Sequence, residues 1–403
     1  MRQATVVTND HQGDDGGTRD ALVPREHFPI LDRATYLNAA SIAPTPSVVR
    51  RSVQRFEEQV GGGGTVTFND EVETRAYEDT RIAAAELVNA APTDIAITTS
   101  ATEALNQVAW WIEPGPGQNV VSIDIEFPSV TYPWFRIGEK TGVEVRLVPA
   151  QDDPAGLAVE DVLARIDDRT AAVCVSHAQY ATGYLMDLRR LADAAHAHGA
   201  LLIVDATQSA GMVPIDVRDD DVDVLVAGSY KWLCGAFGAA VCYLRPELAE
   251  RFRPPFTGWR SRVDAFVFEA DRMPIAPGAR GLEYSTVAYG SGIALGAAIR
   301  YLLNVGIDRI LEHDRALAAV ALAGAADLGG HIMAPSDPEG RTGIGAVRFD
   351  GWDAKTLWQR LAESNVHTSA RLGAIRFSPH LYNNAADIHA ALDALATILK
   401  RGR

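Results

Sequence analysis

From about residue 93 onward, short apolar runs alternate with segments of helical periodicity. The runs of strand length are, in order, IAITT, VVSIDIEF, AAVCVSHA, ALLIVDAT, VDVLVAG and GAAVCYL, and helical patterns such as ATEALNQVAWW and LMDLRRLADAAHAHG follow several of them. Alternation of this kind is typical of βαβ units, in which helices cover both faces of a mainly parallel sheet. The pattern therefore predicts an α/β fold.

The alternation ends near residue 270, after the Pro- and Arg-rich segment RFRPPFTGWRSR. We expect residues 21–270 to form an N-terminal segment and a large domain. Residues 271–403 carry long Ala/Leu helical patterns and the strand-like RTGIGAVRFDG and GAIRFSP, which predict a smaller C-terminal α+β domain. Residues 1–20 have few apolar positions and are expected to be a disordered leader. The four glycines at 61–64 predict a flexible joint between two helices.

Composition and charge narrow the choice of partners. The 403 residues are 47% hydrophobic and carry a net charge of −15, which disfavours binding to nucleic acid or an anionic membrane and favours a small-molecule substrate. Three cysteines cannot form a disulfide framework, and no segment has the length and composition of a signal peptide or a membrane span. We therefore expect a cytoplasmic globular protein.

Five polar clusters each follow a predicted strand. They are TTSATE, DIEFPS, SHAQYATG, DATQS and GSYKW. Because ligands bind at the carboxyl ends of the strands in sheets of this type, we expect the five clusters to meet at one rim of the sheet.

Three features within these clusters suggest one cofactor. Asp205 ends an apolar strand, Ser100 and Thr102 open a helix, and Lys231 lies among bulky apolar neighbours. Taken singly, the aspartate could cap a turn, the hydroxyls could be plain helix caps and the lysine could extend to solvent. Taken together, they match pyridoxal 5'-phosphate (PLP), which needs a carboxylate for its ring nitrogen, donors for its phosphate and an amine for its aldehyde.

The joint pattern of TSATEALN, SHAQYATG, VDATQSAG, SYKW and RFSPHLYN resembles the class V aminotransferase family of fold-type I PLP enzymes. This family includes cysteine desulfurases, kynureninase and isopenicillin-N-epimerase-like proteins. The resemblance runs from YLNAASIAPTP at 36–46 to RFSPHLYNN at 376–384. It implies PLP as the cofactor, a large, mainly parallel, seven-stranded sheet domain with a smaller C-terminal α+β domain, and a homodimer with shared active sites.

Carried over by position, the resemblance gives a role to each matching residue. Lys231 would form the Schiff base with the cofactor aldehyde, Asp205 would pair with the ring nitrogen and Phe127 would stack on the ring. The remaining implied cofactor contacts are Gln179 and Gln208 near the phenolic oxygen, Ala101, Thr102, Ser229 and Tyr230 at the phosphate, and Thr286 at the phosphate of the neighbouring subunit.

The resemblance also implies a substrate-binding arginine. Arg376 matches the arginine that binds the substrate carboxylate, a task that suits a bidentate guanidinium, and Arg371 is the nearby alternative. Tyr36 and Asn38 lie where family members send an N-terminal segment over the substrate. His177 could contact the substrate or simply cap its strand.

The chain departs from the cysteine desulfurases in two ways. Their persulfide-forming cysteine precedes the carboxylate-binding arginine, but the corresponding stretch here, NVHTSARLGAIRFS, has no cysteine, and we interpret Cys234 as structural. Where desulfurases stack a histidine on the ring, this chain has Phe127, whose phenyl ring cannot donate a proton. Both departures argue against persulfide sulfur transfer.

No metal site is expected. The two imidazoles of the HAH sequence at 196–198 are two residues apart at a helix end, so they point to different faces. Trp134, Trp232 and Trp259 are expected to be packing residues, with Trp134 also a candidate for a wall of the pocket.

The sequence thus favours a PLP enzyme acting on an α-amino acid, and among reactions a carbon–sulfur lyase that performs β-elimination on a cysteine-derived substrate, with natural-product biosynthesis as its context. Decarboxylation coupled to oxidative deamination, epimerisation and transamination are alternatives on the same scaffold. A non-catalytic PLP-binding relative is the alternative from another class. The presence of Asp205, Lys231, Thr102 and Arg376 together argues against it.

Overall fold

The computed structural model describes residues 20–150 and 154–402, so the predicted leader lies outside the described residues except for its last position. A seven-stranded sheet with the order β2-β8-β7-β6-β5-β3-β4 forms its centre. Its strands are β2 (Ile95–Thr98), β3 (Asn119–Ile123), β4 (Glu144–Val148), β5 (Thr170–Ser176), β6 (Leu201–Asp205), β7 (Val224–Gly228) and β8 (Ala240–Leu244). Only the two pairs made by β8 are antiparallel, which confirms the predicted α/β fold with a mainly parallel sheet.

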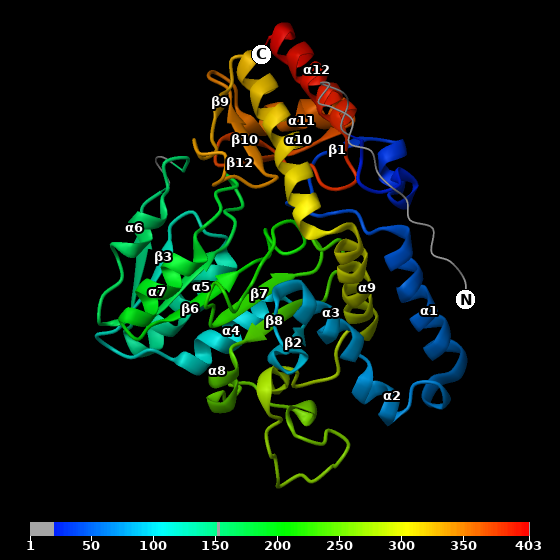
Figure 1. The fold of residues 1–403 in the computed structure, drawn as a ribbon, viewed down its shortest axis with the longest axis vertical. Coiled ribbons are helices and arrows are strands. Elements are labelled where there is room, and N and C mark those ends of the chain that lie inside the picture. Colours follow the sequence, from blue (N-terminus) through cyan, green and yellow to red (C-terminus); the bar gives the residue numbers. More distant parts are fainter. Residues whose placement is uncertain (1–19, 151–153, 403) are drawn as a thin grey trace, which may run out of the picture.

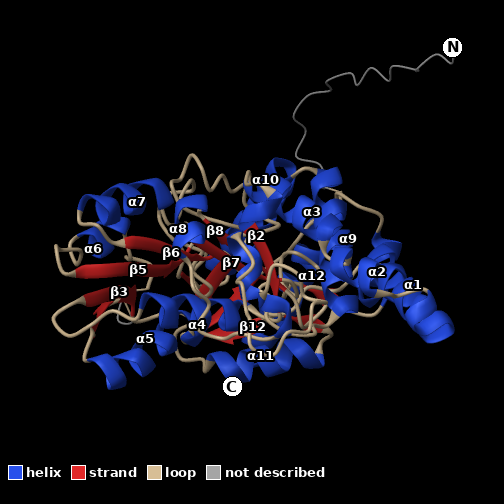
Figure 2. Cartoon of the chain, turned by 90° about the horizontal axis from the view of Figure 1, so that it is seen from below, coloured by secondary structure: helices blue, strands red, loops and turns tan. Residues whose placement is uncertain are grey.

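Helices cover both faces of this sheet (Figure 2). On one face lie α4 (Ala101–Ile112) and α5 (Pro128–Thr141), and on the other lie α3 (Glu78–Val88) and α7 (Leu188–Ala197). Side chains along each strand alternate between the two layers: in β6, Ile203 packs with α4 and α5, whereas Leu202 and Val204 pack with the opposite layer. This two-sided burial explains why the central strands appear in the sequence as continuous apolar runs.

The C-terminal part contains a second sheet of four strands, with the order β12-β13-β10-β9 and antiparallel pairing throughout. The segments RTGIGAVRFDG and GAIRFSP form β10 and β13, as predicted. The elements of this part are β9 (His331–Ile332), β10 (Gly345–Arg348), β12 (Ser369–Arg371), β13 (Ala374–Phe377), α10 (Ile307–Asp327), α11 (Ala354–Glu363) and α12 (Ala385–Arg401). The boundary at residue 270 stays a prediction.

The N-terminal segment returns to this C-terminal part (Figure 1). Its strand β1 (Thr35–Tyr36) pairs in parallel with β11 (Val366–His367). The following helix, α1 (Ser47–Gly63), packs along α9 (Tyr289–Val305). The segment that carries Tyr36 and Asn38 therefore lies beside the C-terminal segment that carries Arg376.

The glycines at 61–64 do not form the expected four-residue joint. Three of them complete the last turn of α1, and Gly64, with a φ of 49°, ends the helix. Glycine adopts a positive φ without a steric penalty, which suits it to the residue at which the chain leaves a helix. Gly64 also begins the short 3-10 helix η3 (Gly64–Val66), so the prediction of a flexible joint at residues 61–64 is wrong.

Among the described residues, no single helix is long and apolar enough to cross a membrane. By length and composition, only α9 and α10 taken together pass as a candidate, and they meet at an angle of 79°. Leu295, Ile299 and Leu302 of α9 are fully buried in the main core, as expected for a core helix of a globular protein.

Candidate active site

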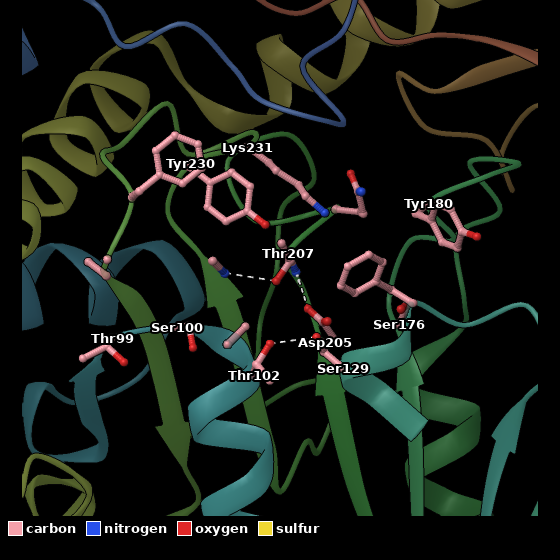
Figure 3. A pocket seen from close by; sticks show the side chains of 17 residues that line it. Thr99, Ser100, Thr102, Ser129, Ser176, Tyr180, Asp205, Thr207, Tyr230 and Lys231 are labelled. Atoms are coloured by element: carbon pink, nitrogen blue, oxygen red, sulfur yellow. Dashed lines mark hydrogen bonds between the residues drawn. The ribbon is translucent and has the colours of Figure 1, made fainter. Parts of the chain in front are cut away.

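A cavity of about 200 Å³ lies at the carboxyl ends of the central strands, and all five polar clusters predicted from the sequence contribute to it (Figure 3). It is lined by Thr99, Ser100, Ala101, Thr102, Phe127, Ser129, Ser176, Tyr180, Asp205, Thr207, Gln208, Gly228, Tyr230, Lys231, Phe237, Gly238 and Ala239. The convergence follows from the parallel topology, because β3, β5, β6 and β7 all end at this edge.

Lys231 follows β7 and is buried against two aromatic rings. Its Nζ atom lies 5.3 Å from the ring centroid of Phe127 and 5.9 Å from that of Tyr230. Within the described part of the chain, no carboxylate is within ion-pair distance of this amine. Burial lowers the pKa of Lys231 to about 8, with Arg376 and Arg371 acting in the same direction and Asp205 opposing them. A substantial fraction of the amine is therefore neutral, and nucleophilic, near pH 8.

Asp205 ends β6 and points its carboxylate into the same cavity (Figure 3). The Thr207 N–H donates to Asp205 Oδ1 at 2.8 Å, and the Thr207 hydroxyl accepts from the Gly228 N–H at 3.0 Å, which ties the ends of β6 and β7 together. Burial raises the pKa of Asp205, while the hydrogen bonds from Thr207 and the charge of Lys231 oppose this rise. A protonated ring nitrogen placed here would supply the cation that a buried carboxylate requires.

Two helices begin side by side at the cavity. Ser100 caps α4 by accepting from the Glu103 N–H at 3.1 Å, and Thr102 Oγ1 lies 2.7 Å from Ser129 Oγ, at the start of α5. The first N–H groups of a helix lack partners within it and carry partial positive charge, so two converging helix starts suit a phosphate. Ser129 was not among the predicted site residues, although DIEFPS contains it.

The two predicted glutamines differ in position. Gln208 lines the cavity; its Oε1 accepts from Trp232 Nε1 at 2.8 Å and its Nε2 donates to the Ala40 carbonyl at 3.0 Å. Gln179 is buried outside the lining, and its Nε2 has no hydrogen-bond partner in the described residues. Its contact with the cofactor stays a prediction.

The two residues after β7 that were predicted to contact the phosphate also differ in position: one lines the cavity and the other does not. Tyr230 lines the cavity and stacks on Phe237 with ring centroids 4.7 Å apart. Ser229 is buried outside the lining and donates its hydroxyl hydrogen to the Ala236 carbonyl. Thr286 also lies outside the lining, where its hydroxyl accepts from Trp259 Nε1 at 3.2 Å. The contact of Thr286 with a second subunit stays a prediction.

Arg376, on β13, is a buried guanidinium without a carboxylate partner among the described residues. Its side chain is 1% exposed; one terminal nitrogen donates to the Tyr180 carbonyl and the other to Ser41 Oγ, both at 2.7 Å, while Nε has no partner there. Burial and the charge of Arg371 lower the pKa of Arg376. Arg371 itself is partly exposed and donates to the Ala370 carbonyl at 2.7 Å. The buried charge of Arg376 thus requires an anionic partner that the described residues do not supply.

Three further candidates lie outside the cavity lining. Tyr36 donates its hydroxyl hydrogen to the Ile42 carbonyl at 2.5 Å, and Asn38 Oδ1 accepts from Ser369 Oγ at 3.1 Å. His177 is buried, and its Nδ1 lies 3.0 Å from Ser209 Oγ. Because burial lowers the pKa of His177 to about 4, its imidazole is neutral at physiological pH. Contacts of these residues with a substrate stay predictions.

Glu126 is a buried carboxyl group that the sequence did not single out. Its oxygens accept from the Ser176 N–H, at 2.7 Å, and from the Ser176 hydroxyl. Burial raises the pKa of Glu126 to about 7, and the negative charge of Asp205 acts in the same direction. Glu126 therefore joins the turn after β3 to the end of β5 at Ser176, a residue of the cavity lining.

Of the residues interpreted as structural, Trp134, Trp232 and Cys234 are buried and Trp259 is not. Trp134 and Trp232 are among the largest fully buried side chains, and Trp134 is not part of the cavity wall. Cys234 is buried, with a φ of 54°. Trp259 is partly exposed and contacts the ring of Phe266 and the guanidinium of Arg260.

An amine, a carboxylate and paired helix starts at the edge of a doubly covered sheet define a PLP-binding enzyme of the α/β class. Residues 35–390 match the family model for class V aminotransferases. The chain is 32% identical to an uncharacterized aminotransferase of Bacillus subtilis, YcbU, over 92% of this chain and 96% of that protein. It is 29% identical to a probable cysteine desulfurase of Methanothermobacter thermautotrophicus, over 94% and 98% of the two chains.

A solved structure agrees with these matches. The cysteine desulfurase CsdA of Escherichia coli superposes with a TM-score of 0.82 at 26% identity, covering 94% of this chain and 98% of that one. The chain belongs to the class V aminotransferase family, and its cofactor is pyridoxal 5'-phosphate.

Proposed function

We propose that this chain is a PLP-dependent lyase that cleaves the carbon–sulfur bond of a cysteine-derived amino acid by β-elimination. The observation that carries the proposal is the buried Arg376, which has no anion in the described chain and donates to the carbonyl of Tyr180, a residue of the cavity that contains Lys231. A buried cation of this kind requires an anionic ligand, and an amino acid brings a carboxylate together with an amine for the cofactor.

The residues of the cavity fit the cofactor. Lys231 would attach to it covalently, Asp205 would bind its ring nitrogen, and the starts of α4 and α5 would hold its phosphate. Phe127, whose ring lies 5.3 Å from Lys231 Nζ, would cover one face of the ring. When bound, PLP supplies an electron sink that stabilises negative charge at the substrate α carbon.

The chain's own groups would then perform the remaining tasks. Arg376 would bind the substrate carboxylate, and Ser41 and the Tyr180 carbonyl would hold the guanidinium in place. Lys231, once displaced by the substrate amine, would be a free amine of lowered basicity and would take the proton from the α carbon. Loss of sulfur from the β carbon releases one thiol, and hydrolysis of the remaining three-carbon fragment gives one pyruvate and one ammonia.

Two features favour simple elimination over persulfide transfer, although several relatives are named cysteine desulfurases. The stretch 365–378 before and around Arg376 contains no cysteine. Cys234, the thiol nearest to Lys231 in sequence, is fully buried and is not part of the cavity lining. Elimination requires no protein nucleophile beyond Lys231.

Transamination is the second candidate, favoured by the relative named an aminotransferase. Transamination would use the same lysine to move the proton from the substrate α carbon to the cofactor, and it would require a keto acid acceptor. Decarboxylation coupled to oxidative deamination and epimerisation stay alternatives on the same scaffold. A place in natural-product biosynthesis also stays a prediction.

We further propose that the enzyme is a cytoplasmic homodimer. Large apolar side chains are exposed on the segment near Thr286, including Phe256, Val263 and Phe268. A second subunit covering this surface would bury them, and it would bring Thr286 to the neighbouring cavity.

Colour and product analysis test the proposed function. The purified protein should absorb in the visible range with added PLP, and S-substituted cysteines should change its spectrum and yield pyruvate, ammonia and a thiol. An aldehyde with carbon dioxide would indicate oxidative decarboxylation, and a changed enantiomer would indicate epimerisation. A protein that stays colourless after PLP is added, or a Lys231→Ala variant with an unaltered spectrum, would contradict the proposal that the chain is a PLP-dependent enzyme.

A further inference from the structure

Trp232, which directly follows Lys231, connects the active site to the C-terminal part of the chain. It is fully buried, and its indole Nε1 donates to Gln208 Oε1 at 2.8 Å. Its backbone carbonyl lies 3.0 Å from His380 Nε2, and the two rings meet nearly perpendicular with centroids 5.0 Å apart. One residue thus contacts both a glutamine of the cavity and a histidine that follows β13.

His380 forms a buried ion pair with Asp314 of α10. Both side chains are completely buried, and Nδ1 of the histidine lies 2.7 Å from Asp314 Oδ2. Each ring nitrogen therefore faces an acceptor, a carboxylate on one side and the Trp232 carbonyl on the other, which requires a proton on both nitrogens. Burial alone lowers the pKa of His380, but the Asp314 carboxylate and, after it, Cys234 outweigh this effect and raise the pKa to about 10. The histidine is thus a charged donor that holds the main chain next to Lys231.

The backbone around Trp232 has little room to move. A side-chain carbon added to Gly211, whose φ is 94°, would lie 2.6 Å from the Trp232 carbonyl oxygen. A carbon added to Gly343 would lie 2.7 Å from Asp314 Cβ and 3.5 Å from the Trp232 ring. Close packing on both sides thus restricts movement of the tryptophan and of its two hydrogen bonds.

The tryptophan also determines the orientation of the Gln208 amide. With Oε1 accepting from the indole and Nε2 donating one hydrogen to the Ala40 carbonyl, the second Nε2 hydrogen is the remaining donor of the amide. Rotating the amide by 180° would place its NH2 group against the indole N–H, so the tryptophan selects donation into the cavity.

We propose that Asp314 and His380 are positioning residues that act through Trp232, fixing the Gln208 amide as a donor toward the cofactor phenolic oxygen and the Lys231 main chain beside it. The proposal rests on the PLP site of the proposed function and does not depend on which bond of the substrate is broken. It assigns a role in the reaction to two residues of the C-terminal part that do not line the cavity.

The positioning of the Gln208 amide can be tested by titrating the visible absorption band of the cofactor with pH in the substrate-free holoenzyme. The quantity measured is the midpoint of this titration. In Trp232→Phe the Gln208 amide loses its orienting donor, so the phenolic oxygen holds the proton shared with the cofactor–lysine linkage more tightly. We expect the midpoint to rise by about half to one pH unit, the equivalent of one ordinary hydrogen bond. Asp314→Asn should move the midpoint in the same direction.

Trp134→Phe is the matched control, because Trp134 is also fully buried but lies on α5 away from Gln208. It should lower the melting temperature without moving the midpoint. An unchanged midpoint in Trp232→Phe, or an equal shift in Trp134→Phe, would overturn the proposal. If Trp232→Phe fails to fold, Asp314→Asn decides alone: a lower melting temperature with an unchanged midpoint means a purely structural ion pair. Because no substrate is present, a failed lyase assay leaves these outcomes unaffected.

Discussion

At the scale of single residues, Lys231 combines burial with the absence of an ion-pair partner in the described chain. A lysine amine attacks an aldehyde only when it is neutral, and burial brings the pKa of this amine down to about 8. The neutral fraction rises with pH and is nearly complete one unit above the pKa. The residue is thus suited both to binding the cofactor covalently and to accepting a proton later.

The loading of PLP onto the apoenzyme should follow this titration. We expect the rate of covalent attachment to rise with pH through about 8 and to level off above it. The growth of visible absorbance after mixing with PLP measures this rate, and Lys231→Ala should show no growth. A rate that keeps rising to pH 10 would mean that the amine has its ordinary basicity.

Substitutions of Arg376 and Arg371 can show which of the two arginines binds the substrate carboxylate. Replacing Arg376 by Lys removes the bidentate fork at a buried site, and we expect kcat/KM for an amino acid to fall by about ten- to a hundredfold, the value of one charged hydrogen bond. Arg371→Lys should change it by less than about threefold, because this side chain is partly exposed. Steady-state kinetics with one S-substituted cysteine decide between them. A larger loss in Arg371→Lys would reverse the assignment.

At the scale of elements, the turn after β3 and the end of β5 are joined by Glu126, whose two oxygens accept from Ser176. Burial raises the pKa of this carboxyl from 4.5 to about 7, so the folded protein binds a proton there that the unfolded chain has released. The stability from this group is fully present below the unfolded pKa and is lost as pH rises through about 7.

Glu126→Gln should remove this pH dependence. The shift from 4.5 to about 7 corresponds to roughly 3 kcal/mol of stability lost by the wild type between pH 4.5 and 7.5. We expect the difference in melting temperature between variant and wild type to change steadily in favour of the variant across this range. Thermal unfolding at several pH values measures it, and parallel curves would show that Glu126 titrates normally.

The same scale shows what the sequence can predict. The central strands and their polar ends were predictable because two-sided burial leaves continuous apolar runs, each followed by the residues that bind ligands. The edge strand β4 was not predicted, because its exposed first residue, Glu144, and the charged Arg146 interrupt the apolar pattern. The roles expected for Ser229 and Gln179 depended on side-chain direction, which spacing along a strand end does not determine.

At the scale of the whole molecule, the active site depends on segments far apart in the chain. Arg376, on the C-terminal sheet, donates to the carbonyl of Tyr180 at the cavity, and His380 reaches Trp232 from the loop that follows β13. The link from Asp314 to Gln208 joins four distant segments through one side chain or carbonyl at each step. No local pattern in the sequence reports such contacts, whereas the resemblance to a family could locate Arg376.

Dimer formation is the prediction that belongs to this scale. Phe268 is 79% exposed on the segment near Thr286, and placing a charge there with Phe268→Asp should weaken a dimer that buries it. We expect sedimentation to give a dimer for the wild type and a shift toward monomer for the variant, with weaker retention of PLP. Wild-type protein that sediments as a monomer and keeps its cofactor would refute shared active sites.

The stoichiometry of the products tests the central claim most directly. With an S-substituted cysteine and no keto acid acceptor, the wild-type holoenzyme should release pyruvate and thiol in equal amounts over many turnovers, and Lys231→Ala should release neither. Activity that appears only when a keto acid is added, or thiol release without pyruvate, would contradict a β-eliminating lyase.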